Sequence, residues 1–364
     1  MKVKDIVSFV EELAPLSYQE SYDNSGLILG DMQMEVSSVL LSLDVTPEVV
    51  AEAIKLGANV IVAHHPVVFT GLKRLTGSNY TEQSVILAIK NNVAIYAAHT
   101  NFDSIKSGVN SAIAAKLGIK NPEILRPLAG ALIKLVTFAP AASAEKVRVA
   151  LLEAGAGHIG NYDSCSYNVE GYGTFRGGHN TNPYVGEKGK IHTEPEVRIE
   201  TILPKAIQGK VLSALFDNHP YEEVAYDLYP LSNTYSGVGS GMVGDTDKPE
   251  EPLEFIKRVK RAFDAGCVRY TRLPGKKVRR VAFCGGSGSF LLKDAIAAKA
   301  DAFITADFRY HQFFDAEDRI LIADIGHYES EQFTIDLFYD YLSKKFPTFA
   351  VFKSKIKTNP INYL

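Results

Sequence analysis

The stretch Val60-Ile61-Val62-Ala63-His64-His65-Pro66 is an apolar run that ends in two adjacent histidines. Short, continuous runs rich in branched side chains are typical of strands buried on both faces of a sheet. The earlier run Val39-Leu40-Leu41-Ser42-Leu43 has the same character. Between the two runs, Thr46-Pro47 is typical of a helix start and Gly57 of a helix end. The segment therefore predicts strand, helix and strand in succession.

The same alternation extends outward from this stretch and returns in the last third of the chain. Predicted strands cover residues 93–98, 278–283, 302–305 and 320–323. Predicted helices cover residues 82–90, 108–117, 290–298 and 329–344. Repeated alternation of strand and helix predicts a layered α/β fold.

The middle of the chain breaks this rhythm. Strand patterns at 132–138, 159–175, 197–202 and 223–229 surround helical patterns at 144–153 and 204–216. The resulting order β-α-β-β-α-β is that of a ferredoxin-like α+β domain. Residues 232–252, which contain Gly237, Gly239, Gly241 and Gly244 and two prolines, predict a linker at its exit.

The composition is that of a globular protein of 364 residues. Lys plus Arg number 39 and Asp plus Glu 42, and 46% of residues are hydrophobic, which excludes a disordered chain and a uniformly basic nucleic-acid-binding surface. No apolar run is long enough to span a membrane, and Asp5, Glu11 and Glu12 interrupt any signal peptide. The three cysteines have no metal-like spacing, so we expect reduced thiols and a cytoplasmic location.

Histidines and carboxylates gather at the ends of three predicted strands. One strand end carries His64 and His65, the next carries His99 and Asp103, and the last leads to His327 and Glu331. Taken alone, an adjacent histidine pair is more often structural, and two helical residues four apart more often share a surface hydrogen bond. Because ligands of open α/β sheets bind at the carboxyl ends of strands, the three groups together predict one metal site.

The ligand types restrict the metal. Imidazoles and carboxylates without thiolates suit Zn, Mn or Fe better than Ca or Mg. Adjacent side chains leave an extended chain in opposite directions, so His64 and His65 suit two ions better than one. A carboxylate able to bridge completes such a pair. We therefore expect two divalent metal ions per chain, with zinc as the first choice and iron or manganese as alternatives.

Several motifs of the chain resemble those of the NIF-three-like family, also called GTP cyclohydrolase I type 2 homologues. The resemblance covers nearly the whole chain, although Tyr22 and Ser25 depart from the usual N-terminal motif. It implies two pseudo-equivalent α/β halves that form one discontinuous domain around a dinuclear metal centre, in a toroidal homohexamer. The matching segments are Tyr22-Asp23-Asn24-Ser25-Gly26-Leu27, Ala63-His64-His65-Pro66, His99-Thr100-Asn101-Phe102-Asp103, Cys284-Gly285-Gly286-Ser287-Gly288-Ser289, Ile304-Thr305-Ala306-Asp307 and Gly326-His327-Tyr328-Glu329-Ser330-Glu331.

The resemblance also implies a ligand set. By it, His64 and His327 hold one ion, His65 and Asp103 hold the other, and Glu331 bridges both.

The resemblance extends to the middle of the chain. Residues 155–162 and 219–225 resemble the PII-like/CutA-like insert of longer family members. The expected domains are therefore a core of residues 1–129 and 246–364 and an insert of residues 130–245. The insert contains four histidines that we do not expect to be ligands, namely His158, His179, His192 and His219.

Four further features can be interpreted as structural or as part of a functional site. His99 is either a general acid or base or a residue that supports a ligand. The turn Gly285–Gly288 is either a phosphate cradle or, as we favour, a tight turn that needs glycine. Asp307 and His311, four apart, predict a structural hydrogen bond. The basic residues Arg269, Arg272, Lys276, Lys277, Arg279 and Arg280 predict a solvated face rather than a nucleotide-phosphate or nucleic-acid contact.

Two functions stay open at this point. The first is a metal-dependent hydrolase with a small-molecule substrate, for which the family resemblance implies GTP, opening of the guanine imidazole ring and release of formate, with His99 protonating the departing nitrogen. The second is a non-catalytic metal-binding or regulatory protein whose PII-like insert senses a small metabolite. A nucleic-acid partner is disfavoured by the acidic net charge.

Overall fold

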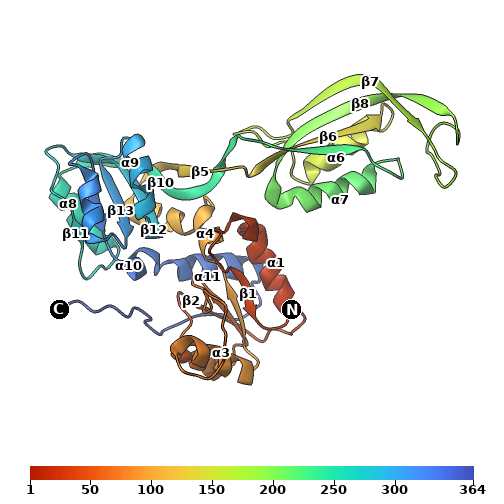
Figure 1. Ribbon diagram of the computed structural model, residues 1–364. Coiled ribbons are helices and arrows are strands. Elements are labelled where there is room, and N and C mark those ends of the chain that lie inside the picture. Colours follow the sequence, from red (N-terminus) through yellow and green to blue (C-terminus); the bar gives the residue numbers. More distant parts are fainter. The chain divides into compact units, whose positions relative to one another are not determined.

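The computed structural model describes residues 1–364. These residues divide into two compact units, the first formed by Met1–Pro127 with Gly237–Leu364 and the second by Leu128–Ser236. Figure 1 shows the ribbon with its element labels. No helix is long and apolar enough to cross a membrane.

The first sheet of the first unit has the strand order β1-β4-β3-β2-β15. Strands β15, β2, β3 and β4 are parallel, and β1 is antiparallel to β4. Alternate residues of β3 enter two different hydrophobic clusters, Val60 and Val62 one and Ile61 the other, so this strand is buried on both faces as predicted. The strands are β1 (Gly26–Leu29), β2 (Val39–Ser42), β3 (Val60–Ala63), β4 (Ala94–Ala97) and β15 (Val351–Lys353).

Helices cover both faces of this sheet. On one face α2 begins after Thr46, whose side chain accepts a hydrogen bond from Val49 N, and ends at Gly57 in the left-handed conformation. It packs with α3 over this face, while α1 and α11 join the cluster on the other face. The helices are α1 (Val3–Leu13), η1 (Leu16–Tyr18), α2 (Pro47–Leu56), α3 (Tyr80–Lys90), α4 (Thr100–Ser104), α5 (Val109–Leu117) and α11 (Thr334–Lys345).

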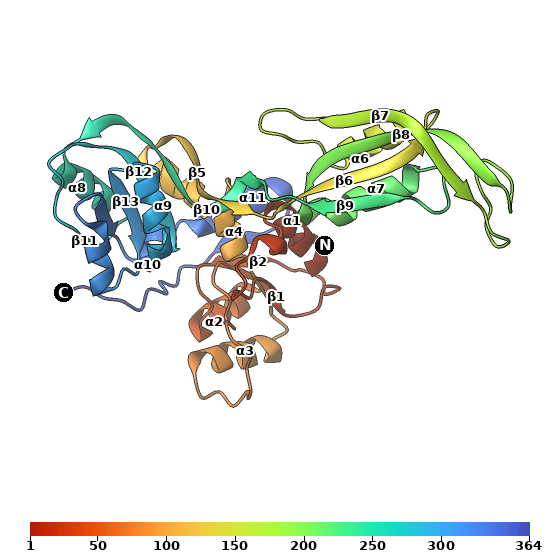
Figure 2. The ribbon, with the colours of Figure 1, turned by 45° about the horizontal axis from the view of Figure 1, so that its top comes forward.

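The second sheet of this unit has the order β11-β14-β13-β12-β10-β5. Helices α8 and α9 lie on its two faces, because Val281 and Phe283 of β12 pack with α8 whereas Ala282 packs with α9 (Figure 2). The elements are β5 (Lys120–Ala129), β10 (Thr234–Glu250), α8 (Pro252–Ala262), β11 (Arg269–Tyr270), β12 (Val278–Ser287), η3 (Ser289–Leu291), α9 (Leu292–Ala297), β13 (Ala302–Ala306), η4 (Tyr310–Ala316), β14 (Leu321–Asp324) and α10 (His327–Glu331).

The expected linker at residues 232–252 is instead the long strand β10. Its glycines permit close packing, because a Cβ at Gly239 would lie 2.1 Å from the Arg126 carbonyl oxygen and one at Gly244 would lie 2.5 Å from the Ile119 side chain. Residues from Gly237 onward belong to the first unit, so the second unit ends at Ser236 rather than at residue 245.

The second unit is a four-stranded antiparallel sheet of order β7-β8-β6-β9 with two helices on one face (Figure 1). Val147 of α6 and Val211 and Leu215 of α7 pack with Leu135 and Ile199 of the sheet into a separate core. The chain order is β-α-β-β-α-β, as predicted. The elements are β6 (Leu132–Pro140), α6 (Ala144–Glu153), β7 (Ser166–Arg176), β8 (Ile191–Pro204), η2 (Lys205–Ile207), α7 (Gln208–Asn218) and β9 (Tyr226–Pro230).

Candidate metal centre

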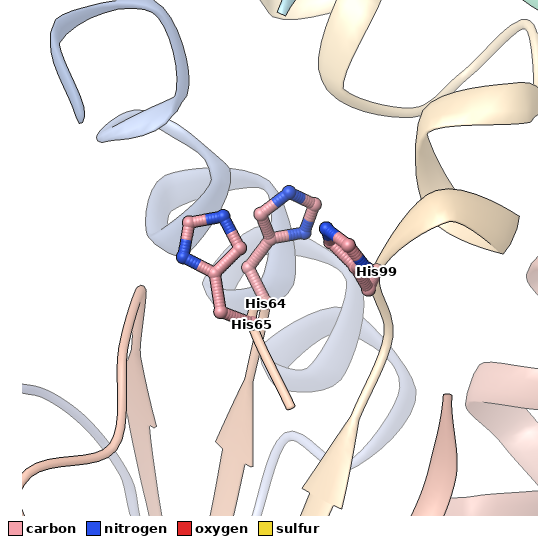
Figure 3. A group of neighbouring side chains, drawn as sticks. All are labelled: His64, His65 and His99. Atoms are coloured by element: carbon pink, nitrogen blue, oxygen red, sulfur yellow. The ribbon is translucent and has the colours of Figure 1, made fainter. Parts of the chain in front are cut away.

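Two imidazoles stand at the carboxyl end of β3 and turn toward opposite neighbours. His64 turns toward β4, where its Nδ1 lies 2.8 Å from the Ala98 carbonyl oxygen. His65 turns toward the end of β2, where its Nδ1 lies 2.7 Å from Asp44 Oδ1. The ring centroids of the two histidines lie 4.9 Å apart, and each lies 5.3 Å from the ring of His99 (Figure 3). The three rings therefore form one cluster above the sheet edge.

A second group comes from the end of β4 and helix α4. His99 precedes α4, and its Nδ1 lies 2.8 Å from Asp23 Oδ1. The other oxygen of Asp23 accepts hydrogen bonds from the Thr100 backbone amide and the Ser25 hydroxyl. Asp23 thereby fixes the orientation of the His99 ring. One turn along α4, Asp103 Oδ1 lies 3.6 Å from His64 Nε2.

Helix α10 supplies the third group from the other sheet of the unit. Its His327 Nε2 and Glu331 Oε2 lie 3.0 Å apart, as residues four apart on one helix face do. The same Glu331 oxygen lies 3.0 Å from His65 Nε2, and its Oε1 lies 3.9 Å from His64 Nε2. Glu331 thus lies between the histidines of both sheets.

The candidate ligand atoms form overlapping groups within 4.8 Å of one another. One group contains His64, Asp103 and Glu331, and another contains His65, His327 and Glu331. This is not the pairing that the family resemblance implies, because His64 turns toward α4 and its Asp103 whereas His65 turns away, toward His327. A third group joins His64, His65 and His99.

The residues fit a metal ion. His64 Nε2 and Asp103 Oδ1 are buried atoms without a hydrogen-bond partner, and both residues belong to the group that includes Glu331. Leaving such atoms unpaired is costly, and a cation would satisfy both. Each histidine also has its Nδ1 committed to an oxygen, which leaves Nε2 for a metal, as is usual for metal-binding histidines.

The pKa shifts of His64, Asp103 and Glu331 come from burial and from the neighbouring charges. Burial lowers the pKa of His64 to about 4, so this imidazole is neutral at pH 7. Burial and then the charge of Glu331 raise the pKa of Asp103 well above its ordinary value. Burial raises the pKa of Glu331, but the charge of His327 together with hydrogen bonds from His327, His64 and His65 lowers it more, so the pKa lies well below its ordinary value. A bound cation would favour the ionised form of Asp103 as well.

Three carboxylates that hold the histidines were not predicted as part of the site. They are Asp23, Asp44 and Asp307, of which Asp307 Oδ2 lies 2.7 Å from His327 Nδ1. The expected Asp307–His311 hydrogen bond is wrong, because Asp307 turns to His327 instead. The sequence did carry a signal, since Asp44 follows β2 closely and Asp307 follows β13 directly, at the same sheet edges as the histidines.

The glycine-rich turn packs against this centre rather than cradling an anion. The Gly285 amide donates to Asn110 Oδ1 and the Gly286 amide donates to the Ser330 hydroxyl. Both amides therefore already donate to partners within the protein and are not free for a phosphate, as the tight-turn interpretation requires.

The basic cluster is largely neutralised. Its members Arg269, Lys276, Lys277 and Arg280 pair with Asp324, Asp301, Glu251 and Asp245. This agrees with a solvated face more than with a surface for phosphates.

The histidines of the second unit join none of the three ligand groups. His192 Nε2 lies 2.7 Å from Glu194 Oε2, and His219 Nε2 lies 2.9 Å from the Phe138 carbonyl oxygen. His158 Nδ1 lies 3.2 Å from the Gly155 carbonyl oxygen.

The sequence matches a described protein family over almost its whole length. A model of the family Duf34/NIF3 (NGG1p interacting factor 3) matches residues 1–360. A Halalkalibacterium halodurans protein is 40% identical over 324 residues, which cover 88% of this chain and 87% of the relative. A Bacillus subtilis protein is 35% identical over 367 residues, covering 99% and 98%. Both relatives are called GTP cyclohydrolase 1 type 2 homolog.

Solved structures show the same likeness. A Bacillus cereus protein described as related to NIF3 superimposes with a TM-score of 0.86 and 39% identity, covering 100% of this chain and 99% of the other. A Staphylococcus aureus protein gives a TM-score of 0.78 and 28% identity with the same coverage. The likeness extends through both units of the chain.

Proposed function

The chain belongs to the Duf34/NIF3 family, and from this membership we propose that it is a hydrolase that depends on two divalent metal ions. The observation that carries the proposal is the position of Glu331 between two groups of candidate ligands, one with His64 and Asp103 and one with His65 and His327. One carboxylate shared by two ligand sets is the arrangement a dinuclear site needs.

We propose zinc as the metal, with iron or manganese as alternatives, because the ligands are imidazoles and carboxylates without thiolate. When bound, such ions lower the pKa of water toward neutrality and polarise the bond under attack. Divided between two ions, the five candidate ligands His64, His65, Asp103, His327 and Glu331 would leave room for water and substrate.

The side chains around the ligands have separate tasks. Asp44, Asp307 and the Ala98 carbonyl hold the three ligand imidazoles by Nδ1, so that each presents Nε2. Asp23 does the same for His99, whose ring lies beside both His64 and His65. In its imidazolium form, with Nδ1–H bonded to Asp23, His99 can hold a second proton at Nε2 and deliver it to a leaving group at the centre.

The substrate we propose is GTP. The support is the name of the relatives, GTP cyclohydrolase 1 type 2 homolog. The proposed reaction consumes two waters: the first adds to the imidazole carbon of guanine and one C–N bond breaks to open the ring, and the second cleaves the resulting formamide so that the carbon leaves as formate. His99 would protonate the departing nitrogen.

Two further features belong to this proposal. We propose that Leu128–Ser236 is a PII-like/CutA-like insert, which its β-α-β-β-α-β order supports. We also propose a homohexamer, for which sedimentation of the purified protein is the test.

The test uses the wild type, the Glu331→Gln variant and, as a control, the Glu317→Gln variant, whose substitution lies on an exposed turn. Metal per chain and formate released from GTP are measured together. We expect two metals per chain and turnover in the wild type and control, and loss of both in Glu331→Gln. Two metals without hydrolysis of GTP or other nucleotides would favour a non-catalytic metal-binding protein. Less than one metal per chain in the wild type would contradict the site itself.

A further inference from the structure

The second unit contains a cavity of about 620 Å³ beside the β7–β8 ribbon and the loop that follows α7. This volume is in the range of small-molecule sites. The cavity lies entirely within residues 128–236, and its lining includes none of the metal-centre residues. The residues that form the cavity are therefore distinct from the candidate metal ligands.

Aromatic rings form much of the wall. Phe138, Phe175, Tyr184 and Tyr221 all line the cavity. The ring of Tyr221 lies 6.1 Å from that of Phe175 and 6.3 Å from that of Tyr184. Rings at this spacing offer their faces and edges to a flat or apolar body, and their faces attract cations.

A carboxylate is fixed among these rings. The Tyr221 hydroxyl donates a 2.8 Å hydrogen bond to Glu196 Oε1. Burial and the nearby Glu196 raise the pKa of Tyr221, so the hydroxyl keeps its proton and stays a donor. One oxygen of Glu196 is thus anchored, and the carboxylate has a defined position in the cavity.

The opposite strand is shaped to leave space for this carboxylate. A Cβ on Gly173 would lie 2.0 Å from Glu196 Oε2, so any side chain there would displace it. A Cβ on the neighbouring Gly171 would meet nothing within 4 Å, so the space beyond it is open. Two glycines on one face of a strand thereby keep both the carboxylate and an approach to it.

The net charge of the side chains that line the cavity indicates the charge of the ligand. The acidic side chains Glu170, Glu196, Glu222 and Glu223 face only two basic ones, Arg176 and Arg198. Arg198 is already paired with Glu200, at 2.9 Å. The lining is therefore net negative, which favours a cation.

We infer that this cavity binds a small organic cation, a protonated amine carried on a planar or apolar body. Glu196 pairs with the ammonium group, and the aromatic rings contact both the ammonium and the body. The requirement for a carboxylate and aromatic faces together distinguishes this ligand class from anions and from neutral aromatic molecules.

The test uses three probes with one aromatic body and different charge, namely tyramine, p-cresol and 4-hydroxyphenylacetate. Binding to the full-length, metal-loaded protein is measured by calorimetry and by saturation-transfer NMR. We expect tyramine to bind at least tenfold more tightly than the other two. Equal binding of the three probes, or tightest binding of the anion, would overturn the inference.

Variants place the binding at this cavity. Glu196→Gln keeps the size of the side chain and an oxygen for Tyr221 but removes the charge, so we expect tyramine affinity to fall at least tenfold. Tyr221→Phe is expected to weaken it less, because the carboxylate stays but loses its anchor. Glu187→Gln, in an exposed pair with Lys190, is the matched control and should bind as the wild type does.

The variants also separate binding from folding and from self-association. Circular dichroism and metal content should be the same in all of them. Unchanged tyramine affinity in a folded Glu196→Gln variant would overturn the inference. The inference would also be overturned if the wild type did not bind tyramine and Glu196→Gln changed the sedimentation of the protein. A second copy of the chain would then occupy the cavity.

Discussion

At the scale of single residues, the orientation of the candidate histidine ligands depends on oxygen atoms that bond their Nδ1 atoms and are not themselves candidate ligands. Four imidazoles belong to the candidate ligand groups, and each has its Nδ1 within 2.8 Å of an oxygen. In the neutral imidazole this fixes the proton on Nδ1 and directs the Nε2 lone pair inward. The partners of His64, His65, His99 and His327 are Ala98 O, Asp44, Asp23 and Asp307.

Replacing one of these partners should weaken metal binding without removing a ligand. In Asp44→Asn, the amide can still accept from His65 but carries no charge, so the imidazole becomes a weaker donor to the metal. We expect affinity at one of the two positions to fall by about 10–100-fold. Competition against a chelator of known affinity measures this change. The exposed Asp315→Asn serves as the control, and equal affinity in both variants would contradict the role of Asp44.

At the scale of elements, the end of β12 acts as a support for α10. Gly286 has φ +58°, and a Cβ there would lie 2.3 Å from Glu331 Oε1 and 3.2 Å from the His327 ring. Its amide donates to the Ser330 hydroxyl of the same helix. The strand backbone therefore lies directly against the two ligands that α10 supplies, and glycine is needed at this contact.

The substitution Gly286→Ala tests this contact. The added methyl group would displace the Glu331 carboxylate, and the left-handed backbone is strained for alanine. We expect metal content after dialysis to fall from two ions to one or none, while circular dichroism keeps the wild-type spectrum. Gly275→Ala is the matched control, because nothing lies within 4 Å of its added Cβ. Full metal content in Gly286→Ala would show that Glu331 has room to move.

Local signals in the sequence predicted many of these elements. Thr46 and Gly57 mark the bounds of α2, and the apolar runs mark β2 and β3, because capping and burial act within a few residues. The strand β10 was missed because Gly237, Gly239 and Gly241 are typical of a linker. In the structure Gly239 lets β10 approach β5 and Gly241 lets it approach Phe283 of β12, and both contacts depend on residues far away in sequence.

For the candidate site, the sequence likewise predicted the residues but not how they pair. Strand ends gave the histidines, Asp103 and Glu331, since parallel strands bring their carboxyl ends to one edge. The division of ligands between His64 and His65 depends on which neighbouring strand each ring faces. The partnership of Asp307 with His327 depends on the pairing of β13 with β14 in the second sheet, and the approach of Glu331 to His65 depends on contact between residues far apart in the sequence. No single segment of the sequence contains this information.

At the scale of the molecule, the two units have separate hydrophobic cores. The core of Leu128–Ser236 comes from its own sheet and its helices α6 and α7. The ligands all come from the other unit, His65 and Asp103 before the interruption and His327 and Glu331 after it. The chain leaves the first unit by β5 and returns by β10, which are neighbours in one sheet.

Excision of the second unit should therefore preserve the metal centre. Replacing residues 128–236 by a short glycine-serine linker joins strands that already lie side by side. We expect this variant to fold and to bind as many metal ions per chain as the wild type. The isolated segment 128–236 should fold and bind none. Circular dichroism measures the folding of the two variants, and metal analysis measures their metal content. A folded excision variant that has lost its metals would contradict the prediction that the first unit alone holds the metal centre.

The edge strand β15 pairs Val351 with Val39 of β2, and the segment beyond it brings the Thr358 hydroxyl to Asp44. A ribosome makes the chain from its amino end, so His64 and His65 are exposed on a nascent chain long before Glu331 and Thr358 exist. During that interval the first sheet lacks its outer strand and the histidines lack the carboxylate between them. We therefore expect the proposed metal capture to wait until the residues up to Glu331 and Thr358 have been translated.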